Sequence, residues 1–241
     1  MALFKSQLAT SVSGSVGGTT YAHNKSGMYM RARSVPVQPN SAAQVAVRAA
    51  LTDLVNRWID TLTPAERNGW NTYAQNVPVV NPLGDSINNS GQNWFIGCNT
   101  PRLQAVSKLS SSLARIDTPP SIYNRGDFTT PTFTIDAVSG ISLPFTTGDD
   151  WVGEDGAAMF IYMGAPQNVG RNFYKGPYRL IAEIAGDSVT PPTSPKAISA
   201  ATCASLGYAI PSSNRFWIAV AVTRADGRLS SRRIIGPVLS T

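Results

Sequence analysis

The chain has 241 residues, of which 42% are hydrophobic and 9% aromatic, so it can bury a core and is not disordered throughout. Only 14% of its residues are charged, against about 25% in an average soluble domain, which suits a surface partly covered by partners. The net charge of +6 is uneven. Residues 1–40 hold four basic residues and no acidic residue. Residues 41–118 hold six basic and five acidic residues, and residues 119–241 hold ten basic and nine acidic residues.

Residues 1–40 are predicted to form an extended basic arm without a helix or strand of its own. The Gly/Ser/Thr-rich run at 11–19 offers too little apolar area to fold alone. Polar and apolar residues alternate in 29–33, which would let this segment add a strand to the edge of a neighbour's sheet. Four charges in forty residues are too dilute for strong phosphate binding, so an acidic protein surface is favoured over nucleic acid. The expected partner-contact residues are Lys5, Tyr21, His23, Lys25, Tyr29, Arg31 and Arg33.

Residues 41–106 are predicted to form a helical domain. One apolar stripe of a first helix consists of Val47, Leu51, Leu54, Val55, Trp58 and Leu62. A second helix is marked by Thr63 as N-cap, Pro64 at the first helical position and Glu66 at the third. A third is expected from Gly91 to about Ala105, with Pro101 able to kink it. Residues 107–120, which end in Thr-Pro-Pro, are predicted to be a linker.

Residues 121–241 show the two-residue period of strands. Strands are expected at 132–136, 141–145, 157–163, 178–184, 216–223 and 229–235. Ser139-Gly140 suits a hairpin turn, and Asp226-Gly227 is a favoured type I′ pair. Short strands with no helical stretch between them predict an antiparallel β-sandwich. The expected fold class is therefore α+β: arm, small three-helix region and C-terminal sandwich.

No catalytic, cofactor-binding or metal site can be assembled from the residue types present. The only histidine, His23, lies in the arm, so the folded body lacks the commonest general base. The four carboxylates within 149–155 lack the EF-hand spacing, which favours a solvated loop over a Ca²⁺ site. The glycines at 14–18 lack the Lys-Ser/Thr ending of a phosphate loop. Cys98 and Cys203 have no Cys or His cluster around them and are expected to be free thiols rather than a disulfide.

The C-terminal part, residues 121–241, resembles a fibronectin type III or immunoglobulin-like domain. Residues 216–231 carry this resemblance: a long apolar strand passes through a small polar turn into a Ser-rich final strand. The resemblance implies a sandwich architecture but no particular activity, since such domains serve adhesion, spacing and display alike.

The N-terminal half resembles uncharacterised proteins encoded among the structural genes of tailed bacteriophages. The matching segments are Gly17-Gly-Thr-Thr-Tyr21, Arg31-Ala-Arg33, Pro39-Asn40, the helix start at 44–48, the turn at 62–70 and Gly91-Gln-Asn-Trp-Phe95. This resemblance implies a component of the virion, assembled in the host cytoplasm.

Together these features predict a non-enzymatic virion structural protein, most simply a capsid decoration or minor head protein anchored by its arm. Its partners would be the major capsid protein or neighbouring copies of itself in a homo-oligomer, without cofactor, small-molecule substrate or membrane. Alternatives are a tail, adaptor or fibre-attachment protein. A host-surface or carbohydrate-binding module is a further alternative, which would depend on exposed Trp151, Phe173 and Tyr174.

Overall fold

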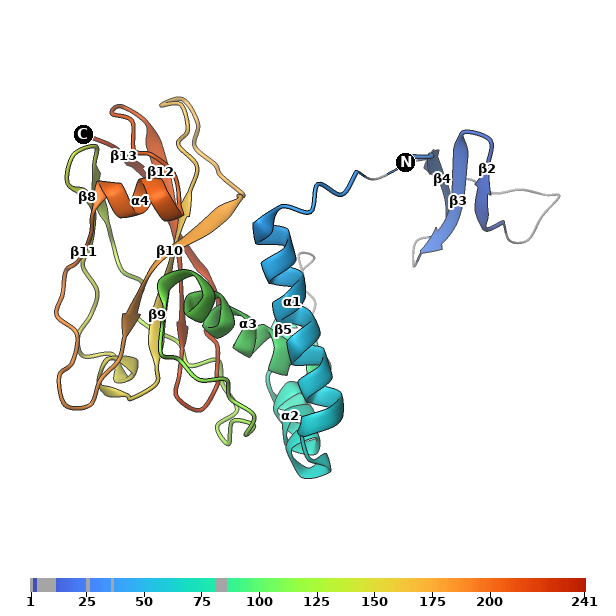
Figure 1. Ribbon diagram of the computed structural model, residues 1–241, viewed down its shortest axis with the longest axis horizontal. Helices are drawn as coiled ribbons and strands as arrows, with labels where there is room; N and C mark the ends of the chain where they lie inside the picture. Colours follow the sequence, from blue (N-terminus) through green and yellow to red (C-terminus); the bar gives the residue numbers. More distant parts are fainter. Residues whose placement is uncertain (1, 4–11, 25–26, 36, 81–85) are drawn as a thin grey trace. The chain divides into compact units, whose positions relative to one another are not determined.

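The computed structural model describes residues 2–3, 12–24, 27–35, 37–80 and 86–241, and it mixes helices with antiparallel sheets (Figure 1). The chain divides into two compact units, Met1–Gln44 and Val45–Thr241. Mixed α and β structure was predicted and is confirmed. The division places the three helices and the C-terminal strands in the same unit.

The N-terminal unit is a four-stranded antiparallel sheet in the order β1-β4-β3-β2. Its strands are β1 (Ala2–Leu3), β2 (Gly14–Val16), β3 (Thr19–Asn24) and β4 (Gly27–Ala32). The prediction that residues 1–40 hold no strand of their own is therefore wrong. Gly17 adopts φ +57°, which lets β2 turn back into β3. Residues 29–32 of the alternating segment pair with β3, and β4 also pairs with β1, so both edges of this strand are used within the chain.

The helices of the second unit are α1 (Ala42–Asn56), α2 (Pro64–Asn76) and α3 (Gly91–Leu109). A π-helical turn, Arg57–Thr61, extends α1, and the short strands β5 (Val79–Val80) and β6 (Ser86–Ile87) pair between α2 and α3. The predicted capping box is confirmed: Thr63 Oγ1 accepts from the Glu66 N–H, and Glu66 Oε2 accepts from the Thr63 N–H. None of the helices in the described part of the chain has the length and apolarity that crossing a membrane requires.

The apolar stripe predicted for the first helix is only half buried. Leu54 and Leu62 lie in the core formed with α2 and α3, but Val47 and Leu51 are about half exposed. The first turns of α1 therefore run beyond the hydrophobic cluster that its C-terminal part joins. The third helix continues to Leu109, past the predicted end, with Pro101 inside it.

The remaining strands form two facing antiparallel sheets, called here the two-sheet body. One sheet has the order β10-β9-β12-β13 and the other β11-β8-β7. The strands are β7 (Thr134–Asp136), β8 (Gly140–Leu143), β9 (Ala158–Gly164), β10 (Tyr178–Ala185), β11 (Lys196–Ile198), β12 (Arg215–Thr223) and β13 (Arg233–Leu239). Side chains from both sheets, such as Met159, Ile141 and Ile218, share one core.

Local chemistry explains where the strand prediction succeeded and where it was wrong. Residues 137–139 turn β7 back into β8, one residue before the end of the predicted Ser139-Gly140 turn. Gly140, at φ +97°, begins β8 and pairs with Asp136. The turn at Asp226-Gly227 is not type I′, because only Gly227 has positive φ and its N–H donates to the Arg224 carbonyl. The body also contains a helix that was not predicted, α4 (Ala200–Leu206), which begins at Ser199 as N-cap.

Helix α3 joins the helical region to the two-sheet body. Its first half places Trp94, Phe95 and Cys98 in the helical core. Its second half places Ala105 against the outer face of the larger sheet, beside Phe160 of β9 and Ala219 of β12. Every residue of β9 is consequently buried, on both faces of the sheet.

Residues 107–120 do not behave as a free linker between two compact units. Leu113 is buried against the outer face of the sheet. The buried Asn99 side chain accepts from the Ile116 N–H at 2.8 Å and donates to the Ile116 carbonyl at 2.9 Å. The Trp70 indole donates to the Asp117 carbonyl at 2.7 Å. Side chains of the helices thus hold this segment by its backbone.

Arg102 of α3 fixes the junction between helices and sheet. Its Nε donates to the Ala114 carbonyl at 2.7 Å, its Nη2 to the Gly156 carbonyl at 3.1 Å and its Nη1 to Thr223 Oγ1 at 3.1 Å. The side chain is buried, and this burial lowers its pKa from the ordinary arginine value. One guanidinium therefore ties together three segments that are distant in the sequence.

Replacing Arg102 with Met is expected to destabilise the protein by about 3 kcal/mol, because the buried Thr223 hydroxyl and the partly buried carbonyls of Ala114 and Gly156 lose their donor. Urea unfolding followed by tryptophan fluorescence measures this loss. The matched control is Lys108→Met, on the same helix but exposed, which should change stability by less than about 0.5 kcal/mol. Equal effects of the two substitutions would contradict the role given to Arg102.

Candidate interaction surface

The N-terminal sheet has one apolar face. The register pairs Tyr21 with Met30 and His23 with Met28, so these four side chains lie on the same side. Val16 joins them, because it pairs with Thr19 two residues before Tyr21. The opposite face is more polar: Thr20 pairs with Arg31 there, and the Ser15 and Thr20 hydroxyls share a hydrogen bond of 2.8 Å.

The described side chains of this sheet are exposed or half-buried on both faces. Among residues 12–35, no side chain that the structure describes is buried. Val16 is 73% exposed and Met30 37%. A sheet needs a packed hydrophobic face for independent stability, and the side chains described at 12–35 do not form one. Its apolar face is thus suited to a partner.

The structure divides the predicted partner-contact residues between the two faces. Tyr21 and His23 lie on the apolar face, and Tyr29 and Arg31 on the opposite one. Arg33 follows β4, and its N–H donates to the Gly18 carbonyl at 2.8 Å. Lys5 and Lys25 lie outside the described residues. Sequence reasoning selected the basic and aromatic residues of this segment and missed the face that Tyr21 shares with Val16, Met28 and Met30.

Two of the three aromatic residues predicted to be exposed on the C-terminal part are buried, so that prediction is wrong for them. Trp151 is 1% exposed and packs against Phe145, with ring centroids 5.6 Å apart. Tyr174 stacks on Trp217 at 5.8 Å, and its hydroxyl donates to the Pro177 carbonyl at 2.7 Å. Only Phe173, at 69%, is exposed. A surface built from all three side chains therefore does not exist.

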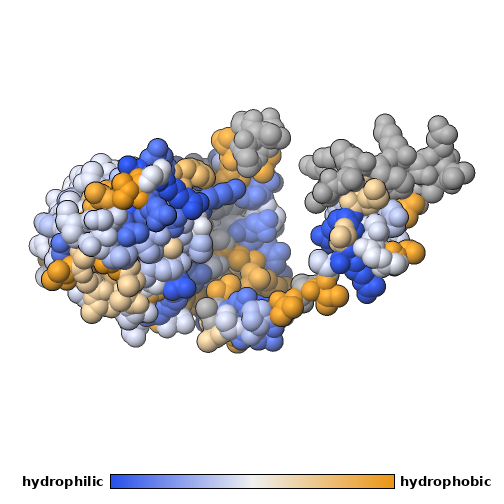
Figure 2. All heavy atoms as spheres, turned by 90° about the horizontal axis from the view of Figure 1, so that it is seen from above, coloured by the Kyte–Doolittle hydropathy of each residue, from blue (hydrophilic) through white to orange (hydrophobic). Residues whose placement is uncertain are grey.

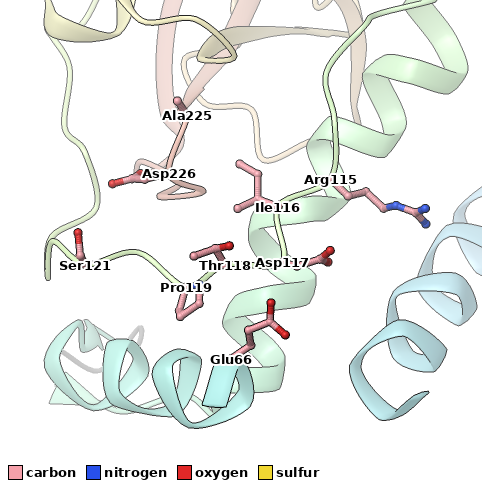
Figure 3. A pocket seen from close by; sticks show the side chains of 9 residues that line it. All are labelled: Glu66, Arg115, Ile116, Asp117, Thr118, Pro119, Ser121, Ala225 and Asp226. Atoms are coloured by element: carbon pink, nitrogen blue, oxygen red, sulfur yellow. The ribbon is translucent and has the colours of Figure 1, made fainter. Parts of the chain in front are cut away.

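A hollow of about 570 Å³ lies between the start of α2, residues 115–121 and the turn at 225–226 (Figure 3). Its acidic side chains already have partners. Glu66 belongs to the capping box, Asp117 binds the Arg57 guanidinium, and Asp226 accepts from Arg228 Nε at 2.7 Å. These groups hold the surrounding segments together.

The four carboxylates of the acidic run at 149–155 contact protein partners, and two of them, Asp150 and Glu154, share Arg224. Asp149 accepts from the Thr129 N–H and hydroxyl, Glu154 binds Arg224, and Asp155 binds Ser188. In the described parts of the chain, no three His, Cys, Asp or Glu side chains are grouped so that they could hold a metal ion.

Both cysteines are buried, and both are free thiols rather than partners in a disulfide, as predicted from the sequence. Burial raises the pKa of the Cys98 thiol to about 12 and that of Cys203 to about 11. Because the thiolate is the reactive form, both side chains act as small hydrophobic groups at neutral pH.

Asp117→Asn is expected to destabilise the protein at pH 7, with the difference from the wild type shrinking as the pH falls. The hydrogen bond from Arg57 lowers the pKa of the Asp117 carboxyl below its usual 3.8. Stability from this pair is thus fully present above the unfolded-state pKa and is lost as the pH falls through the lower folded-state pKa. Urea unfolding of the variant and the wild type at several pH values between 7 and 2 measures this difference in stability. Asp60→Asn, at an exposed site nearby, is the control. A stability difference between Asp117→Asn and the wild type that does not change with pH would contradict the expectation.

Comparison with known proteins finds no matching family model, no matching curated protein and no matching solved structure. A function is therefore inferred from the surfaces of the molecule itself. The most distinctive of them is the uncovered N-terminal sheet.

Proposed function

We propose that this chain is a non-enzymatic structural protein of a bacteriophage virion, attached to the particle through its N-terminal sheet. The most direct role is a capsid decoration or minor head protein. One observation carries the proposal: a complete four-stranded sheet in which no described side chain of residues 12–35 is buried. Such a sheet gains its hydrophobic stabilisation when a partner covers it.

Charge favours a different virion protein, the major capsid protein, as the occupant of the sheet. Residues 1–40 hold four basic residues and no acid, so two copies of the sheet would repel each other. The fitting partner has an apolar patch for Tyr21, Met28 and Met30 and a net negative charge that attracts the four basic residues of 1–40. Contacts of this kind weaken as salt rises.

The two-sheet body would then be the part that the particle displays. Four strands facing three over a shared core is the strand count of an immunoglobulin constant-type sandwich, and we keep the fibronectin type III or immunoglobulin-like assignment within this proposal. The carbohydrate-binding alternative loses its basis, because Trp151 and Tyr174 are buried.

The proposal is tested on the particle that carries the chain. Removing residues 1–38 should abolish incorporation, measured by mass spectrometry of purified particles, while the remaining chain keeps its thermal unfolding transition. Tyr21→Ser combined with Met30→Ser, on the apolar face, should lower the occupancy at least about tenfold.

The matched control is Tyr29→Ser, which makes the same kind of change on the opposite face and should leave the occupancy unchanged. Occupancy at the wild-type level without residues 1–38 would overturn the proposal. Electron microscopy then identifies the location: a decoration protein repeats over the capsid lattice, whereas a tail or adaptor protein occupies a single vertex.

A further inference from the structure

The loop at 165–177, which connects β9 to β10, presents one aromatic side chain on a fixed backbone. Phe173 is 69% exposed, and its carbonyl accepts from Arg171 Nε at 2.9 Å. Arg171 also donates to Gln167 Oε1 at 2.8 Å, and Arg215 of β12 donates to the Arg171 carbonyl at 3.0 Å. An exposed aromatic ring on a backbone held in this way is typical of a binding hot spot.

The surroundings of Phe173 are positively charged. Between Asp155 and Glu183 the sequence contains no acid, whereas Arg171, Lys175 and Arg179 are all exposed there. Figure 2 looks onto this end of the two-sheet body and shows strongly hydrophilic residues gathered beside a few hydrophobic ones. The phenyl ring is thus accompanied by cations and suits an apolar hollow with a negative rim.

A hollow of this chemistry lies elsewhere in the same unit. It has a volume of about 540 Å³, and its apolar walls include Leu113, Ala114 and Ile116. The buried Arg102 also lines it, and a guanidinium is a favourable partner for an aromatic face. Asp155 and Asp187 are the two carboxylates of its lining.

These two carboxylates are held by loop backbone. Asp155 accepts from the Ser188 N–H at 2.7 Å, and Asp187 accepts from the N–H groups of Val189 and Thr190 at 2.8 and 2.7 Å. The hydrogen bonds fix the positions of the carboxylates, and each carboxylate has capacity for further donors. Cations such as Arg171 and Lys175 match them.

The loop and the hollow lie at opposite ends of the same pair of strands. The loop follows Gly164, where β9 ends, and precedes Tyr178, where β10 begins. The hollow adjoins Ala157, just before β9, and Gly186, just after β10. Seven residues of strand separate them by about 23 Å. Phe173 therefore cannot fill the hollow of its own chain, but it can fill that of another copy.

We propose that copies of this chain associate head to tail, with Phe173 of one copy seated in the Arg102-lined hollow of the next. Arg171 and Lys175 then meet Asp155 and Asp187 across the contact. Because the two surfaces differ, the contact is heterologous and produces rings or filaments rather than closed dimers. It involves only residues 45–241 and does not depend on what the N-terminal sheet binds.

The test uses the full chain in sedimentation velocity at increasing concentration. The wild type should form species that grow beyond a dimer and shrink in 1 M NaCl. Phe173→Ala removes the ring, and Ala114→Trp fills the hollow from an exposed position. Each variant alone should self-associate at least about tenfold more weakly than the wild type. An equimolar mixture of the two variants should form dimers and nothing larger. The intact loop of Ala114→Trp can enter the intact hollow of Phe173→Ala, and no second contact of this kind is left to extend the dimer.

The control Tyr123→Ala removes another exposed aromatic side chain and should assemble like the wild type. Thermal unfolding shows whether the variants are folded, which is expected because the changed side chains are exposed. The proposal would be overturned if Phe173→Ala formed species as large as those of the wild type. It would also be overturned if the mixture of Phe173→Ala and Ala114→Trp stayed monomeric. A wild type that is monomeric at all concentrations would overturn it too, while leaving the attachment of the N-terminal sheet to the capsid unaffected.

Discussion

The unit formed by residues 45–241 depends on the Arg102 guanidinium and the helix that carries it. A buried cation is costly unless its donors are satisfied, and here backbone carbonyls and the Thr223 hydroxyl satisfy them without a carboxylate. Because those acceptors belong to three separate segments, the arginine is satisfied only when helix, connecting segment and sheet are all in place. Helix α3 therefore links the formation of the helical core to that of the sheet.

This link explains why helices and facing sheets form one compact unit. That unit contains three hydrophobic clusters: one among the helices, one between α3 and the larger sheet, and one between the two sheets. The N-terminal sheet has backbone pairing, but none of the side chains described at 12–35 is buried. Hydrogen bonds contribute modestly to net stability compared with apolar burial, so the sheet has the pairing but lacks the larger stabilising contribution. A protein of an assembly can combine the two, with one part stable alone and the other completed by a neighbour.

Much of the secondary structure could be predicted from the sequence, because local chemistry determines it. The Thr63 capping box and the apolar run that becomes β9 are examples. The N-terminal strands were missed because composition indicated disorder, while the Gly17-Gly18 turn between alternating segments was the available signal. Trp151 and Tyr174 were misplaced because exposure depends on tertiary packing. Arg102 could not be recognised, since most of its acceptors are backbone carbonyls and its one side-chain acceptor, Thr223, is distant in the sequence.

Burial of β9 on both faces has a consequence for the history of the gene. The outer face of the larger sheet, with Phe160 and Ala219, is covered by side chains that the helical segment supplies. A two-sheet body transferred to another protein by recombination would leave that face in water, where it would promote aggregation. Helices and strands must therefore be inherited together. The N-terminal sheet belongs to a separate compact unit, so exchange between genes could replace it without exposing this face.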